Sequence, residues 1–149
     1  MIRTLAAAAL IAGLAAPALA QDVSDCDLRS SARNLAEPWE DSTRTFAQGA
    51  IRLAVIDMIE PAGAPFYLLV LSPPYDEIGD RQCRMIGGST GMGLYSIDLA
   101  GATAAYEAAR GLVVSVPTRV YGDASGQPTA SRLTVTINQA TGEISATAD

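Results

Sequence analysis

The feature that most constrains the fold is a repeated alternation of apolar and other residues in short runs. In residues 49–57, GAIRLAVID, an extended chain places Ile51, Leu53 and Val55 on one face and Arg52 on the other. A period of two is typical of a β-strand with one face turned toward a core. The pattern recurs along the chain, so the sequence predicts a β-rich fold.

Turns rich in Gly and Pro separate these runs. We expect strands at 49–57, 66–71, 81–86, 94–99, 101–106, 112–116, 133–137 and 144–148. The 66–71 run, FYLLVL, is wholly apolar and is bounded by prolines, which predicts a buried central strand. Pro117 predicts that its own strand lies at a sheet edge or at a bulge. The sequence therefore predicts an all-β fold, an antiparallel sandwich or small barrel of about seven strands.

Residues 100–110, AGATAAYEAAR, are ambiguous because alanine favours a helix and the neighbouring runs favour a strand. The spacing from Tyr106 to Gly111 matches the spacing from Ile137 to Gly142, and each glycine precedes a new alternating run. This is typical of a hairpin loop with glycine in the left-handed conformation. We favour a strand here, and the alternative is an α+β fold with 100–110 helical. Across the second hairpin, the expected facing sets are Leu133, Val135 and Ile137, and Ile144, Ala146 and Ala148.

Residues 24–36, SDCDLRSSARNLA, predict a short N-terminal helix. Ser24 and Asp27 form a weak capping box, and the apolar residues that follow keep a helical spacing.

The first twenty residues predict a secretory signal peptide. Arg3 is followed by a small and apolar run over 5–16, and Ala-Leu-Ala then ends at Ala20. The run has about a dozen residues, whereas a membrane-spanning helix needs ~20. We expect cleavage between Ala20 and Gln21. The expected domains are a signal peptide over 1–20 and a single exported globular domain over 21–149, located in the periplasm and not inserted in a membrane.

The chain has two cysteines, Cys26 and Cys83. In an oxidising compartment such a pair is typical of a disulfide bond. The alternative is a reactive or metal-binding pair, but neither cysteine belongs to a C-x-x-C motif and the chain has no His. We therefore expect a structural disulfide.

The chain is acidic, with ten basic residues against sixteen acidic ones and a formal net charge of −6. Like-charge repulsion argues against binding to nucleic acid or to anionic lipid. We therefore expect a partner of another kind, an unidentified protein or envelope component.

The stretch GGSTG at 87–91 matches G-x-S-x-G, the pattern of a nucleophile elbow centred on Ser89. A serine nucleophile needs a base, usually His and sometimes Lys, and the chain contains neither. We expect a flexible turn, with a backbone anion nest as the alternative. We assign no catalytic residue and expect a protein that is not an enzyme.

The acidic residues cluster in two places. Asp76, Glu77 and Asp80 form the denser group, and Asp25 with Asp27 the other. Neither group has the ligand spacing of a calcium loop, so solvated loops are favoured over a metal site. We expect no metal and no cofactor.

A polar connector around Pro38, EPWEDSTRT, contains the only tryptophan, Trp39. We favour a Trp39 that covers one end of the core. The alternative is a contact surface that comprises Trp39 and Arg44.

Several stretches together resemble a group of small, uncharacterised exported proteins of alphaproteobacteria: NLAEPWEDSTRTFAQGAIRLAVID, LLVLSPP, RQCR and NQATGEI. The resemblance covers most of residues 21–149 and implies a periplasmic protein of one domain. It implies no activity, cofactor or site residue.

Three functions are compatible with these observations. We favour a non-catalytic binding or interaction module, because the chain lacks most catalytic side chains. The first alternative is an inhibitor of an exported hydrolase, such as a lysozyme or protease, that presents the loop 87–93. The second is a carboxylate-only hydrolase, which requires a cleft with two acids, one of them with a raised pKa.

Overall fold

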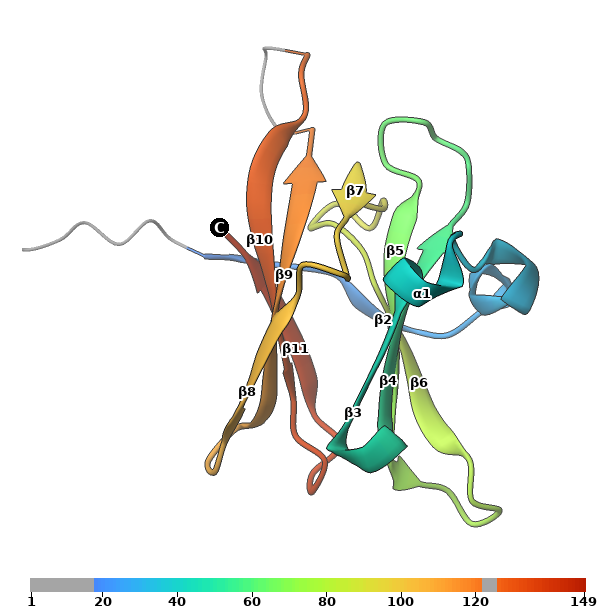
Figure 1. The fold of residues 1–149 in the computed structure, drawn as a ribbon, viewed down its shortest axis with the longest axis vertical. Helices are drawn as coiled ribbons and strands as arrows, with labels where there is room; N and C mark the ends of the chain where they lie inside the picture. The colour runs from blue at the N-terminus through green and yellow to red at the C-terminus, as the bar shows by residue number, and fades with distance from the viewer. Residues whose placement is uncertain (1–17, 122–125) are drawn as a thin grey trace, which may run out of the picture.

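The computed structural model describes residues 18–121 and 126–149, which form two antiparallel sheets packed face to face (Figure 1). The expected all-β sandwich is confirmed. The α+β alternative is wrong, because residues 103–107 form a strand. Among the described residues, no helix is both long and apolar enough to cross a membrane.

The C-terminal sheet has six strands, in the order β1-β11-β10-β9-β7 with β8 also paired to β9. Its strands are β1 (Leu19–Ala20), β7 (Ser96–Ile97), β8 (Thr103–Glu107), β9 (Gly111–Val120), β10 (Thr129–Ile137) and β11 (Ile144–Ala148).

The N-terminal sheet has five strands, in the order β2-β6-β5-β4-β3. Its strands are β2 (Val23–Asp25), β3 (Thr43–Phe46), β4 (Ile51–Asp57), β5 (Phe66–Tyr75) and β6 (Arg81–Ile86). The helical segments are short: α1 (Trp39–Ser42) and the 3-10 turns at Leu28–Ser30, Ala32–Asn34 and Ala47–Gly49.

The main core lies between the two sheets and is built from the predicted alternation. Ile51, Leu53 and Val55 of β4 face Val114 and Val135 of the other sheet within one buried cluster. The wholly apolar run in β5 is a central strand, as predicted. Burial of branched aliphatic side chains is the main force that holds the two layers together.

A second buried cluster lies on the outer face of the N-terminal sheet. Ala54 and Ile56 of β4 pack there with Tyr67, and the segment from Cys26 to Leu35 covers them. The expected disulfide is present: Cys26 and Cys83 are bonded, with their Cα atoms 5.4 Å apart. The disulfide fixes this covering segment to β6.

The prediction of a short helix over 24–36 is wrong. Its first residues join β2, where Asp25 pairs with Arg84 of β6. The rest forms two separate 3-10 turns, because Ser31 between them is extended, with φ −62° and ψ 142°. Asp27 does cap a turn, since its side chain accepts a hydrogen bond from the Arg29 N–H, at 2.9 Å.

Both hairpins of the C-terminal sheet have the predicted glycine. Gly111 has φ 95° and Gly142 has φ 79°, the left-handed conformation that glycine tolerates best. In the second hairpin the register pairs Leu133 with Ala148, Val135 with Ala146 and Ile137 with Ile144, as predicted.

The edge position expected for Pro117 is wrong, because β9 lies between β10 and the pair formed by β7 and β8. On the side of β9 that faces away from β10, the neighbouring strand changes at Pro117. β8 pairs with β9 as far as Ser115, and β7 pairs with β9 from Thr118. The Pro117 carbonyl accepts a hydrogen bond from the Asp98 N–H, at 2.9 Å, so its nitrogen also faces this junction. Because proline lacks its N–H on this side, no hydrogen bond between β9 and β10 is lost.

We predict that replacing both cysteines by serine lowers the free energy of unfolding by about 4 kcal/mol, because the bond closes a loop of about 60 residues. Urea unfolding of residues 21–149 measures the effect. Hydrogen exchange should rise first in the segment 26–36. Coincident unfolding curves for the two proteins would contradict the prediction.

We predict that Gly111→Ala destabilises the fold more than Gly49→Ala does. Both glycines have a φ near the same value, 95° and 90°. A Cβ at Gly111 would meet the backbone carbonyl oxygen of Ile137, whereas a Cβ at Gly49 would meet nothing within 4 Å. We expect a loss of about 1 kcal/mol at Gly49 and about 1–3 kcal/mol more at Gly111. Equal losses in thermal unfolding would show that the close contact is unimportant.

Candidate functional site

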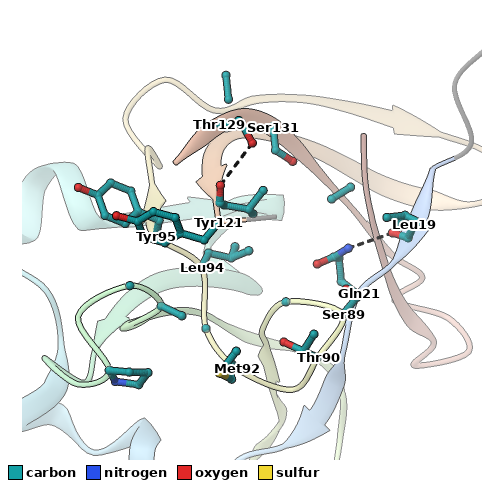
Figure 2. A pocket seen from close by; sticks show the side chains of 18 of the residues that line it. Leu19, Gln21, Ser89, Thr90, Met92, Leu94, Tyr95, Tyr121, Thr129 and Ser131 are labelled. Atoms are coloured by element: carbon teal, nitrogen blue, oxygen red, sulfur yellow. Dashed lines mark hydrogen bonds between the residues drawn. The ribbon is translucent and has the colours of Figure 1, made fainter. Parts of the chain in front are cut away.

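A cavity of about 660 Å³ opens at one end of the sandwich, between the two sheets (Figure 2). This volume lies within the range of about 300–1,000 Å³ that is usual for small-molecule pockets. Its lining comes from 19–21, 61–64, 88–95, 120–121, 129–131 and 148–149. Segments from both sheets therefore contribute, and we call this cavity the end pocket.

The glycine-rich loop at 87–93 forms one wall of the end pocket. It is a closed turn, since the Gly88 N–H donates to the Met92 carbonyl at 2.6 Å and the Gly91 N–H donates to the Gly88 carbonyl at 2.9 Å. A Cβ at Gly93 would meet the backbone oxygens of Ala64 and Phe66. Glycine is needed here because the loop lies directly against the β4–β5 connection.

Two tyrosines form a side wall of the end pocket (Figure 2). The rings of Tyr95 and Tyr121 meet edge to face, with their centroids 5.1 Å apart and an interplanar angle of 81°. The Tyr121 ring also lies 3.2 Å from the position that a Cβ of Gly63 would take. The Arg119 guanidinium stands 5.8 Å from the Tyr95 ring centroid and donates to the Pro128 carbonyl at 3.0 Å. These contacts fix the orientation of the aromatic wall.

The polar groups of the end pocket are few and mostly uncharged. Ser89, Thr90 and Ser131 contribute hydroxyl groups, and Gln21 contributes an amide. Among the described lining residues, Asp149 has the only charged side chain. Such a lining can enclose an apolar group and offer it a few hydrogen bonds.

Ser89 is exposed at the rim of this pocket, in the closed turn. The sequence singled out this segment for its resemblance to a nucleophile elbow, but in the structure it connects β6 to an antiparallel bridge at Leu94. A nucleophile elbow instead joins a strand to a helix. The local geometry is therefore that of a pocket wall.

The two acidic clusters lie outside the end pocket and are engaged locally. One oxygen of Asp76 accepts hydrogen bonds from the N–H groups of Ile78, at 3.0 Å, and Asp80, at 2.8 Å. Asp25 pairs with Arg84 at 2.9 Å. In the part of the chain that the structure describes, no group of three or more His, Cys, Asp or Glu is arranged to hold a metal ion.

Arginines lower the pKa of two carboxyl groups. A side-chain hydrogen bond from Arg29 lowers the pKa of Asp27, and one from Arg110 lowers the pKa of Glu107. Both shifts favour the ionised form. A catalytic general acid needs the opposite shift.

Trp39 and Arg44 do not line the end pocket. Trp39 is 61% exposed, so the favoured interpretation that it covers an end of the core is wrong. The chain turns from Pro38 through the single turn α1 directly into the edge strand β3, and this places the indole at the surface. Neither α1 nor β3 was predicted from the polar connector.

Arg44 links the two sheets. From β3 of the N-terminal sheet, its guanidinium donates to the Leu99 carbonyl at 3.2 Å and also to the Ala100 carbonyl, in the turn before β8. The side chain is therefore occupied by an intramolecular contact.

Apart from the loop 87–93, which was considered for Ser89 and as the loop that an inhibitor would present, the residues that line the end pocket were not predicted as a site. Tyr95 and Tyr121 lie 26 positions apart in the sequence, and Met92 lies in a loop. Only the density of glycine over 87–93 signalled that the backbone approaches another segment closely.

Comparisons with models of known protein families, with curated proteins and with solved structures found no match to this chain. The case for a function therefore depends on the geometry of the end pocket and on the sequence.

We predict that Arg44→Gln lowers the free energy of unfolding by about 1 kcal/mol, because two charged hydrogen bonds between the sheets are lost at an exposed site. Arg52→Gln is the matched control, since Arg52 is exposed on the outer face of the adjacent strand β4. Urea unfolding measures both variants. An equal change in the two would show that the link to 99–100 adds no stability.

Proposed function

We propose that this chain is an exported, non-catalytic binding module that acts in the periplasm as residues 21–149. It holds an uncharged, apolar group of its ligand in the end pocket. The observation that carries the proposal is the end pocket itself, a cavity of about 660 Å³ between the sheets that is lined mainly by apolar and small residues.

Exposed apolar side chains around the end pocket support a binding role. Within residues 21–149, Met92 is 51% exposed and Tyr121 48%, and both line the cavity. Exposed apolar residues that gather at a concave site are typical of a ligand or partner surface.

The β4–β5 connection adds a second observation. Ile59 has φ 67°, although a β-branched residue rarely adopts this conformation, and its side chain is 75% exposed. The Asp57 carboxylate holds it there by accepting a hydrogen bond from the Ile59 N–H, at 2.7 Å. Strain of this kind concentrates at functional sites. The same connection supplies Pro61, Gly63 and Ala64 to the end pocket.

Export is supported by the signal-peptide pattern and is compatible with the disulfide between Cys26 and Cys83. The resemblance to small exported alphaproteobacterial proteins agrees with this location.

Inhibition of an exported hydrolase is the second candidate. The closed turn at 87–93 is held by its own hydrogen bonds and by the β4–β5 connection, and it presents Met92. Inhibitors act through such pre-organised loops. Slower turnover by lysozymes or periplasmic proteases at micromolar concentrations of the protein would support this candidate. A carboxylate-only hydrolase has less support, since Asp149 is the only acidic residue among the described residues of the pocket lining.

We predict that residues 21–149 bind a neutral naphthyl fluorophore in the end pocket with saturable enhancement of its emission. Ser131→Trp should weaken this binding at least about ten-fold, because the added indole occupies the cavity. Thr134→Trp is the matched control, since it lies on the same strand, β10, and alternation places it on the opposite face. Equal affinity of the probe for all three proteins would contradict the proposed site.

A further inference from the structure

The last two residues of the predicted signal peptide occupy a defined position in the fold. Leu19 and Ala20 form β1, which pairs with the edge of β11 so that Leu19 lies opposite Ala148 and Ala20 opposite Thr147. Leu19 also lines the end pocket (Figure 2). Cleavage after Ala20 would remove β1 and leave this part of β11 as an open edge.

The residues after the cleavage point are held without help from β1. The Gln21 N–H donates to the Ala146 carbonyl at 2.9 Å, and the Asp22 carbonyl accepts from the Gly87 N–H at 3.0 Å. β2 then pairs with β6 on the other sheet. Cleavage of the bond between Ala20 and Gln21 would turn the backbone nitrogen of Gln21 into an α-ammonium group. This group would therefore remain beside β11.

The open edge would offer unpaired backbone groups. The Ala146 carbonyl points toward β1, because it accepts from Gln21, and residues two apart in a strand present their backbone groups on the same side. The N–H and C=O of Ala148 therefore point outward as well. An exposed edge of this kind binds extended peptides by adding a strand.

We propose that the position vacated by Leu19–Ala20 binds the C-terminal end of an extended segment of another exported protein. This inference depends on the proposed function. The bound tail pairs with β11 and places an apolar penultimate side chain at the end pocket, where Leu19 lies in the uncleaved chain. Its terminal carboxylate forms an ion pair with the α-ammonium group of Gln21.

The α-ammonium group that cleavage would create at Gln21 favours such a tail. A carboxylate that replaces the carbonyl of Ala20 would lie next to a cation held by the fold, and charged hydrogen bonds of this type are the stronger ones. The acidic side chain of the pocket, Asp149, lies toward the other end, because the antiparallel register places the tail's C-terminus near Ala146. A free C-terminus is therefore the part of a polypeptide that fits best.

The test uses residues 21–149 and a fluorescent peptide with the sequence of residues 15–20, AAPALA, labelled at its N-terminus. Fluorescence anisotropy measures binding of the free acid, of the C-terminal amide, and of a peptide with Leu replaced by Asn. We expect the free acid to bind at least about ten-fold more tightly than the amide, because only the acid forms the ion pair. The Asn peptide should also bind more weakly, because it loses the apolar contact.

Two protein variants locate the site. Ala148→Pro should weaken peptide binding at least about ten-fold, because it removes the outward N–H of β11. A chain that begins at Ala20 moves the α-ammonium group by one residue, so it should lose the preference for the acid over the amide. Near-ultraviolet circular dichroism checks that both variants are folded.

Four results would overturn the inference. Binding of the naphthyl fluorophore without binding of any peptide would reject the peptide site and leave the proposed function standing. Equal binding of acid and amide, unaffected by Ala148→Pro, would show that the end pocket holds only the apolar side chain. A dimer in sedimentation that Ala148→Pro dissociates would show that a second copy occupies the edge. If neither the fluorophore nor the peptide binds, the proposed function fails as well.

Discussion

Burial of both faces of the N-terminal sheet is the constraint on which the rest of the structure depends. On β4, Leu53 and Val55 face the other sheet, while Ala54 and Ile56 face outward and are also buried. The sheet therefore needs two covers. One is the C-terminal sheet, and the other is the irregular segment that begins at Cys26. This segment is too short to make a stable core of its own. The disulfide to β6 helps to hold it in place.

The end pocket lies at the end of the sandwich where loops replace the apolar contacts between the two sheets. Core residues such as Leu94 close its inner side, and the glycine-rich turn, the tyrosine pair and the β4–β5 connection form its walls. These walls are held by backbone hydrogen bonds and ring contacts rather than by aliphatic packing alone. A ligand would therefore meet a preformed site, which reduces the entropic cost of binding.

Local patterns predicted strands at the positions of β4 to β11 and the second hairpin register, because alternation and the left-handed glycines at 111 and 142 are properties of short segments. Sequence patterns gave wrong predictions where contacts between distant segments determine the structure. Pairing of β2 with β6 prevented the helix expected over 24–36, and the change of neighbour beside Pro117 allowed proline inside a sheet. The pocket residues were not predicted for the same reason, since loops from both sheets meet only after the layers have packed.

The disulfide lies within one layer of the sandwich, and this has a consequence for how the protein is made and how its halves are held together. Every strand from β2 to β6 is complete once residue 86 has been synthesised, so this half can be locked covalently before β7 to β11 have emerged. Apart from the continuous backbone, no covalent bond described here joins the two halves. The contact between the layers therefore depends on non-covalent interactions, which at the end pocket include the paired backbone hydrogen bonds between Phe66 and Leu94.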